Sequence, residues 1–182
     1  MNWLTTLLVL IAAFLAVFWG AAWQGLRHFL GAQIDLLPGL MVYASLCGGL
    51  TSVVLLAVLG GLWFDSLSAN PLGISILPLF IVGLVLHVWR ELILQDQPFA
   101  QLALGLAASA AAPLLTLVLL LTTGHSPLLG WGSLWQLIVM AVGGGLATPI
   151  WFLVFEWLQG RLAHHGDLPS SFRPDREIRR GR

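Results

Sequence analysis

One carboxylate in this sequence stands apart as a group that could do chemistry. Asp65 follows a run of uncharged residues and precedes Ser66 and Ser68. An ionisable group in such an apolar chain is typical of a functional or partner-contacting position. The alternative is structural, with the carboxylate hydrogen-bonded to Ser66, Ser68 or backbone amides of the turn that leads to Asn70-Pro71. The residue types favour the structural role.

The remaining reactive side chains suggest packing or interfacial positions. Glu156 lies close to Arg161 in sequence, and we expect it to reach toward the membrane interface near that residue. His87 precedes Glu91 by one helical turn, so it either pairs with that carboxylate or packs near a helix end. Cys47 is the single cysteine of the chain, which excludes an internal disulfide and a cysteine-based metal cluster. Its apolar neighbours predict a buried thiol.

No arrangement of residues is typical of an enzyme. The sequence contains no Gly-x-Ser-x-Gly elbow, no phosphate-binding loop and no His-Glu-x-x-His pair. A transporter of ions or protons would usually carry a relay of buried charges, which this chain lacks. We therefore expect no catalytic residue, no cofactor, no metal and no enzymatic activity.

Composition places the chain in a membrane. Of its 182 residues, 58% are hydrophobic and 9% are charged, whereas about 25% of residues are charged in soluble proteins. Six of the eight arginines lie within residues 161–182, and there is no lysine. We expect a transmembrane helical domain over residues 1–160 and a basic tail over 161–182. A nucleic-acid binder would need a basic face elsewhere, and none is evident.

Charge-free windows predict six membrane segments in an all-α bundle. A span needs about 20 apolar residues to cross a core of about 30 Å. The window over residues 36–64 is too long for one span, and Gly48-Gly49 interrupts it. The alternative is one long tilted helix there, which would give five spans. The predicted segments cover about residues 3–23, 37–47, 50–65, 72–93, 99–122 and 132–159.

Asparagine and proline positions predict where helices begin and bend. Asn70 suits an N-cap and Pro71 suits the first helical position. Pro78 is expected to bend the same helix about two turns from its start. Pro113 and Pro149 are expected to kink the last two segments.

Arginine positions predict the orientation of the segments. Basic residues favour the cytoplasm, so the tail over 161–182 and the loop with Arg90 should both be cytoplasmic. The loops around residues 65–70 and 124–130 should face outward. Six spans then place the N-terminus inside and leave Arg27 outside as one exception to the rule.

Small residues are frequent on the predicted helices. Ala57, Gly105 and Gly144 each lie among alanine, glycine, serine or threonine neighbours. Such positions allow helix backbones to approach closely in a bilayer. Either they pack helices of this chain together, or at least one forms a docking face for another membrane protein.

Residues 61–73 resemble the signature of a known family. They read Gly-Leu-Trp-Phe-Asp-Ser-Leu-Ser-Ala-Asn-Pro-Leu-Gly. The rod shape-determining MreD family has Gly-Leu-x-x-Asp-x-Leu-Ser followed by Pro-Leu-Gly. The matching positions are Gly61, Leu62, Asp65, Leu67, Ser68, Pro71, Leu72 and Gly73. The family often has Pro-Asp-Leu earlier in the chain, whereas this chain has Ile34-Asp35-Leu36 and lacks the proline.

The resemblance implies a multi-pass, non-enzymatic subunit of the cell-elongation machinery in the bacterial inner membrane. Its partners would be the bitopic protein MreC and, indirectly, the actin-like MreB and the wall synthases RodA and a class B penicillin-binding protein. The implied fold resembles the six-helix substrate-binding subunit of energy-coupling-factor vitamin transporters. That fold suggests the alternative function of vitamin capture, which needs a polar pocket. Its candidate residues are Asp65, Ser66, Ser68, Asn70 and His125.

Overall fold

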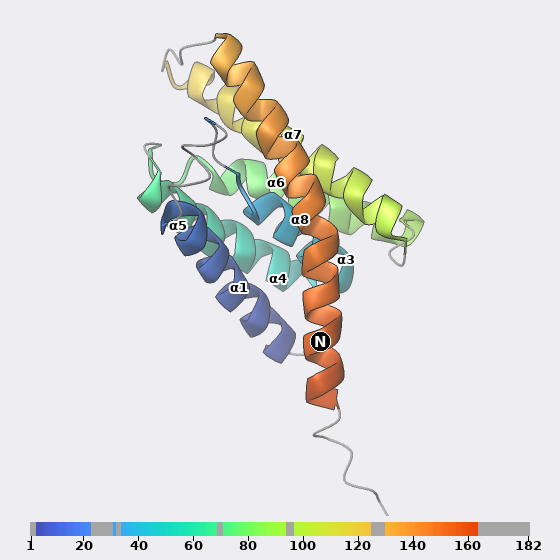
Figure 1. The fold of residues 1–182 in the computed structure, drawn as a ribbon. Coiled ribbons are helices and arrows are strands. Elements are labelled where there is room, and N and C mark those ends of the chain that lie inside the picture. Colours follow the sequence, from blue (N-terminus) through green and yellow to red (C-terminus); the bar gives the residue numbers. More distant parts are fainter. Residues whose placement is uncertain are drawn as a thin grey trace, which may run out of the picture.

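The described part of the chain is entirely helical or irregular. The computed structural model describes residues 3–22, 31, 34–68, 71–93, 97–124 and 130–163, and no strand occurs among them. The elements are α1 (Trp3–Ala22), α3 (Leu37–Cys47), α4 (Leu50–Leu55), η1 (Leu56–Gly60), α5 (Gly61–Leu67), α6 (Ile76–Trp89), η2 (Arg90–Leu92), α7 (Pro98–Thr122) and α8 (Trp131–Ala163) (Figure 1).

Four helices in this described part are long and apolar enough to cross a membrane. They cover Trp3–Ala22, Leu50–Leu67, Pro98–Thr122 and Trp131–Arg161. Large apolar side chains are exposed along α1 and α8, as expected for surfaces that face lipid rather than water. The molecule is therefore a helical membrane protein. The predicted segments at 37–47 and 72–93 correspond to the shorter helices α3 and α6.

The predicted helix break at Gly48-Gly49 is confirmed. Helix α3 ends at Cys47, α4 begins at Leu50, and the backbone of both glycines is extended. The Gly48 N–H donates to the Ala44 carbonyl oxygen over 3.0 Å, and a Cβ atom at position 48 would overlap that same oxygen. Only glycine fits this reversal, and one continuous helix over 36–64 is wrong.

The helix that follows this break contains a π-helical turn. Elements α4, η1 and α5 run continuously from Leu50 to Leu67, with the wider turn over Leu56–Gly60. A π turn inserted in an α-helix changes the angular position of the residues after it. After this turn, Gly61 and Asp65 are four residues apart on α5 and therefore share one buried face of it.

The start of α6 differs from the sequence-based expectation. The helix begins at Ile76, after a turn over residues 71–75, so Pro71 is not its first residue. Asn70 lies outside the described residues. Pro78 lies in the first turn of α6, where its missing N–H has no intrahelical partner to lose. The expected bend two turns into this helix therefore has no basis. Pro113 and Pro149 lie inside α7 and α8, which both continue past them.

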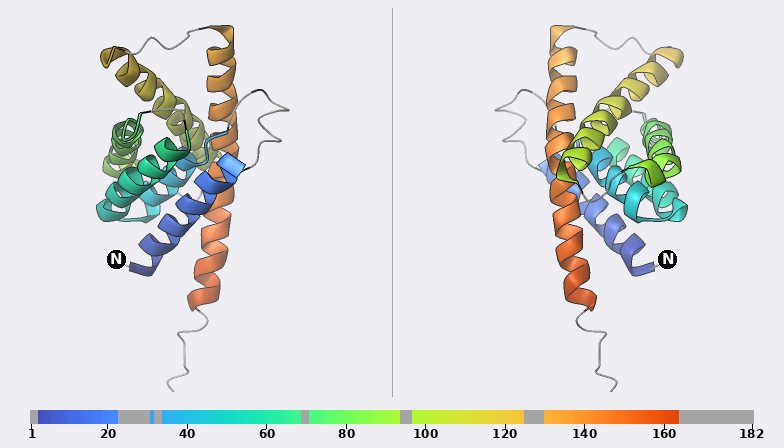
Figure 2. Two further views of the ribbon diagram at one scale, coloured as in Figure 1. Left: turned by 90° about the vertical axis from the view of Figure 1, so that its left-hand side faces the viewer. Right: turned by 90° about the vertical axis from the view of Figure 1, so that its right-hand side faces the viewer.

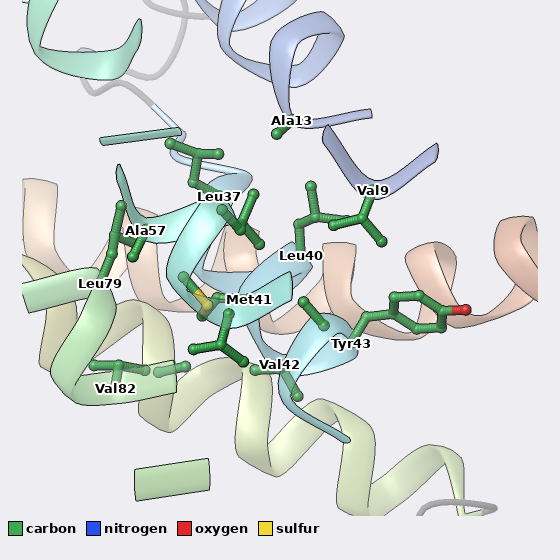
Figure 3. Packing of buried hydrophobic residues seen from close by; sticks show 14 of the residues in the cluster. Val9, Ala13, Leu37, Leu40, Met41, Val42, Tyr43, Ala57, Leu79 and Val82 are labelled. Carbon is green, nitrogen blue, oxygen red and sulfur yellow. The ribbon is translucent and has the colours of Figure 1, made fainter. Parts of the chain in front are cut away.

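Helix α3 lies at the centre of the core. All of its residues from Leu37 to Leu46 are buried, against α1, α6, α7 and α8. Figure 3 shows its side chains packed between Val9 and Ala13 of α1 on one side and Leu79 and Val82 of α6 on another. Since every face is covered, α3 has no polar stripe, as expected for a fully buried helix.

Small residues join α7 to α8 and exclude the predicted docking faces. A Cβ atom at Gly105 would overlap Thr148, and one at Gly144 would overlap Ser109, so both glycines lie between α7 and α8. Figure 2 shows these two helices crossing. Ala57 is fully buried in the core. All three positions are covered by other helices of the same chain. The expectation that one of them forms an outward docking face is wrong, and the internal-packing alternative holds.

Candidate functional site: the Asp65 turn and the adjoining cavity

Asp65 holds the turn between α5 and α6. The residue is 2% exposed. Its Oδ2 atom accepts hydrogen bonds from the Gly73 N–H over 2.8 Å and from the Ser75 N–H over 3.1 Å. Its Oδ1 atom accepts one from the Ser75 hydroxyl over 2.5 Å. The carboxylate thus satisfies two backbone donors of the turn that precedes α6, and the predicted structural role with backbone amides is confirmed.

The neighbouring serines do not contact this carboxylate as predicted. The Ser66 hydroxyl donates to the Trp63 carbonyl oxygen over 2.8 Å, and the Ser68 hydroxyl donates to the Asp65 backbone carbonyl over 3.4 Å. Both bonds stay within the last turn of α5. The hydroxyl that does reach the carboxylate belongs to Ser75, which lies outside the 61–73 signature. Sequence reasoning missed Ser75 because its contact depends on how the chain reverses.

Two glycines of the signature shape the same turn. A Cβ atom at Gly61 would lie 3.0 Å from the Cα and N atoms of Ile76, so glycine lets the backbone of α6 approach α5. Gly73 has a φ of +90°, a conformation that other residues rarely adopt. Together with Asp65, these two glycines determine the backbone geometry of the turn.

The leucines among residues 61–73 are exposed on the surface of the turn. Leu62, Leu67 and Leu72 are 38%, 54% and 73% exposed. Pro71 is also exposed, and Ser68 is half-buried. The signature therefore separates into buried residues that fix the turn and exposed apolar residues that it displays.

A cavity of about 390 Å³ adjoins the turn. It lies between the turn, the segment before α3, and helices α7 and α8. Its polar lining residues are Asp35, Ser68, Ser75, Thr116, Ser133 and Gln136. Asp65 does not line the cavity, and its carboxylate oxygens are hydrogen-bonded to Gly73 and Ser75 instead.

Asp35 is the ionisable residue of this cavity, and it precedes α3. Its Oδ1 atom accepts a hydrogen bond from the Leu37 N–H over 2.9 Å. Burial raises the pKa of this carboxyl group to about 6, although the Leu37 hydrogen bond partly opposes that rise. Its only signal in the sequence is the partial Ile34-Asp35-Leu36 match.

Comparison with known proteins gives no further assignment. No family model, curated protein or solved structure matches this chain. Among the described residues, no three histidine, cysteine, aspartate or glutamate side chains lie close enough to hold a metal ion. The interpretation of the site therefore depends on its own residues and geometry.

A second cavity, of about 690 Å³, lies where other helix ends meet. The Gln159 side-chain amide donates to the Tyr43 hydroxyl over 2.9 Å, joining α8 to α3. The hydroxyls of Thr6 and Ser52 are 2.7 Å apart and join α1 to α4. Its ionisable or polar lining residues include Thr5, Thr6, Tyr43, Cys47, Ser52, His87, Arg90, Glu156 and Gln159.

The side chains near this second cavity settle several predictions. His87 Nδ1 lies 3.1 Å from the Ser45 carbonyl oxygen, so the packing role is confirmed in place of a pair with Glu91. Arg161 stacks over the ring of Trp157, with its guanidinium carbon 4.2 Å from the ring centroid. Cys47 is exposed at the end of α3, so the predicted buried thiol is wrong. His125 and residues 164–182 of the tail lie outside the described residues.

Proposed function

We propose that this chain is an MreD-family subunit of the bacterial cell-elongation machinery, without catalytic activity of its own. It resides in the inner membrane and docks an MreC-like bitopic protein. Through that partner it acts with MreB and with the RodA and penicillin-binding protein wall synthases. The observation that supports this most is the division of residues 61–73 into a hydrogen-bonded turn and an exposed apolar set.

A docking subunit needs a rigid frame and outward side chains, and the Asp65 turn combines both. Three hydrogen bonds to one buried carboxylate hold the turn in a single conformation. Leu67 and Leu72 lie on either side of that turn and are exposed. In this proposal the buried residues keep the leucines in position, and the leucines contact the partner.

The proposal includes six membrane segments with both termini in the cytoplasm. Helix α3 has 11 residues and is about 16 Å long at about 1.5 Å per residue, which is shorter than the hydrocarbon core. Such a short segment is tolerated because protein surrounds it. Reporter fusions at both termini should give cytoplasmic signals. An external N-terminus with an internal C-terminus would contradict the six-segment arrangement.

The docking role is tested by removing the exposed leucines. The double variant Leu67→Ser and Leu72→Ser should accumulate in the membrane with unchanged thermal stability but lose co-purification of the single-span partner. Leu92→Ser is a matched control, because Leu92 is 77% exposed near the opposite end of α6. If the native chain, the double variant and the Leu92→Ser variant all recover equal amounts of the partner, then Leu67 and Leu72 are not contacts.

The cellular role is tested by depletion. Rod-shaped cells that lose the protein should become round, because the proposed machinery supports synthesis of the lateral wall. Cells that keep their shape on depletion would contradict the elongation role.

The cavity beside the turn favours a second candidate function, substrate capture for an energy-coupling-factor vitamin transporter. Its volume of about 390 Å³ and its mixed polar and apolar lining suit a small ligand. Under this alternative, depletion should abolish uptake of a vitamin, and transporter ATPases should co-purify with the chain.

A further inference from the structure

The Asp35 cavity has the size and lining of a small-molecule site. Its volume of about 390 Å³ lies within the range of about 300–1,000 Å³ that is usual for ligand pockets. Five separate parts of the chain contribute to it: the segment before α3, the end of α5, the start of α6, α7 and α8. Because its wall comes from separate parts of the chain, this site forms only in the folded protein. The docking role proposed for Leu67 and Leu72 does not use it.

The charge in this cavity is negative. Asp35 is the one ionisable residue among its described lining, and the residues facing it from α5, α6, α7 and α8 are uncharged. Its Oδ1 atom accepts the Leu37 N–H, whereas Oδ2 has no hydrogen-bond partner in the part of the chain that the structure describes. Among the described residues no basic group lies beside this partly buried carboxylate, which favours a ligand that carries positive charge.

Two hydroxyl groups of the cavity lining already donate their hydrogen atoms to other groups of the protein. The Ser75 hydroxyl donates to Asp65 Oδ1, and the Thr116 hydroxyl donates to the Ala112 carbonyl oxygen over 3.0 Å. Toward the cavity these groups therefore offer lone pairs, as Asp35 does. Asp35 and these two hydroxyl groups therefore favour a ligand with hydrogen-bond donors, while the Gln136 side-chain amide of the same lining can also donate.

The rest of the wall is apolar. Helices α7 and α8 contribute aliphatic and thioether side chains, which suit a hydrocarbon chain or ring rather than a sugar or a phosphate. These residues are Leu114, Leu117, Leu120, Leu137 and Met140.

We propose that this cavity binds an organic cation: a protonated primary or secondary amine on an apolar body, with the ammonium group at Asp35 and the body against α7 and α8. The same chemistry is available from a free amine and from the amine headgroup of a lipid. This binding goes beyond the docking function and does not depend on it.

The proposal is tested by calorimetric titration of the full-length chain in phosphatidylcholine nanodiscs. The probes are 2-phenylethylamine, its neutral analogue 2-phenylethanol and the anion 3-phenylpropanoate. The amine should bind about tenfold more tightly than the alcohol, because a charge-assisted hydrogen bond is replaced by a neutral one, and the anion should bind least. Equal affinities for the three probes, or no heat with the amine, would overturn the proposal.

Matched variants locate the binding. Asp35→Asn keeps an acceptor for the Leu37 N–H and should weaken amine binding about tenfold while leaving the alcohol unchanged. Glu156→Gln removes a carboxylate from the second cavity and should leave amine binding unchanged. An unchanged affinity in Asp35→Asn, or an equal loss in Glu156→Gln, would contradict the assignment to this cavity.

Two further measurements use the native chain. Amine binding should weaken between about pH 7.5 and about pH 5, since Asp35 becomes protonated while the amine stays charged. Phosphatidylethanolamine in the nanodiscs should compete with the amine if a lipid headgroup is the natural source, and should have no effect if a free amine is. Amine binding that is independent of pH over this range would contradict the role of the carboxylate.

Discussion

Two helix reversals in this chain are made by opposite means. The α3–α4 reversal depends on what is missing at Gly48, because any side chain there would overlap the Ala44 carbonyl oxygen. The α5–α6 reversal depends on what is present at Asp65, whose carboxylate joins residues eight and ten positions further along the chain. The first is a local steric solution. The second couples two helices through one buried carboxylate, within residues 61–73.

The largest expected effect distinguishes the two reversals directly. Asp65→Leu removes three hydrogen bonds and leaves the Gly73 and Ser75 amides without their acceptor, which should lower the free energy of unfolding by about 3–5 kcal/mol. Asp65→Asn retains an acceptor and should cost less, about 1–2 kcal/mol. Thermal unfolding of detergent-purified protein measures both. A leucine variant as stable as the native chain would show that the carboxylate does not hold the turn.

A smaller loss is expected at the steric reversal. Gly48→Ala should destabilise the chain by about 1–3 kcal/mol, because the added methyl group must displace the Ala44 carbonyl. Gly132→Ala in α8 is the control, since nothing lies within 4 Å of its added Cβ, and alanine there should be neutral or slightly stabilising. The same unfolding measurement applies, and equal effects at the two positions would contradict the steric account.

The smallest effect concerns Asp35, the carboxylate near the Asp65 turn that has one hydrogen bond instead of three. Its pKa is about 6 in the folded chain, above the ordinary 3.8, so between these values the folded chain binds more protons than the unfolded chain. Stability should therefore fall by about 1 kcal/mol, after allowance for solvent screening, as the pH rises from about 4 to about 6. Asp35→Asn should remove this fall. A native chain whose stability rises over that range would contradict the pKa shift.

Local features of this fold could be predicted from the sequence, and long-range contacts could not. Gly48-Gly49 marked a real break because paired glycines act on the backbone where they occur. The start of α6 was misplaced because the turn over residues 71–75 is held by a long-range contact, from the Asp65 carboxylate to the Gly73 and Ser75 amides. Small residues at Gly105 and Gly144 correctly indicated close helix approach, but nothing in the sequence could tell an internal partner from an external one.

The candidate site likewise contains residues that could be identified from the sequence and residues that could not. Asp65 was identified because it is an isolated charge in an apolar run. The Asp35 cavity was not, because five separate parts of the chain contribute to its wall and none has a distinctive pattern alone. Ser75 and Thr116 became significant only when the acceptors of their hydroxyl groups were known.

The burial of α3 has a consequence for how the chain is made. A segment of 11 residues enclosed by other helices is held in the membrane by protein rather than by lipid, so we expect it to leave the insertion machinery only together with α4, as a helical pair. Cys47, exposed at the end of α3, can report this event. On ribosome-bound chains stalled at increasing lengths, a thiol reagent confined to the cytoplasmic side, where the six-segment arrangement places Cys47, should label this residue only once α4 has left the ribosome and inserted. Labelling of Cys47 before α4 has emerged would mean that α3 enters the bilayer alone.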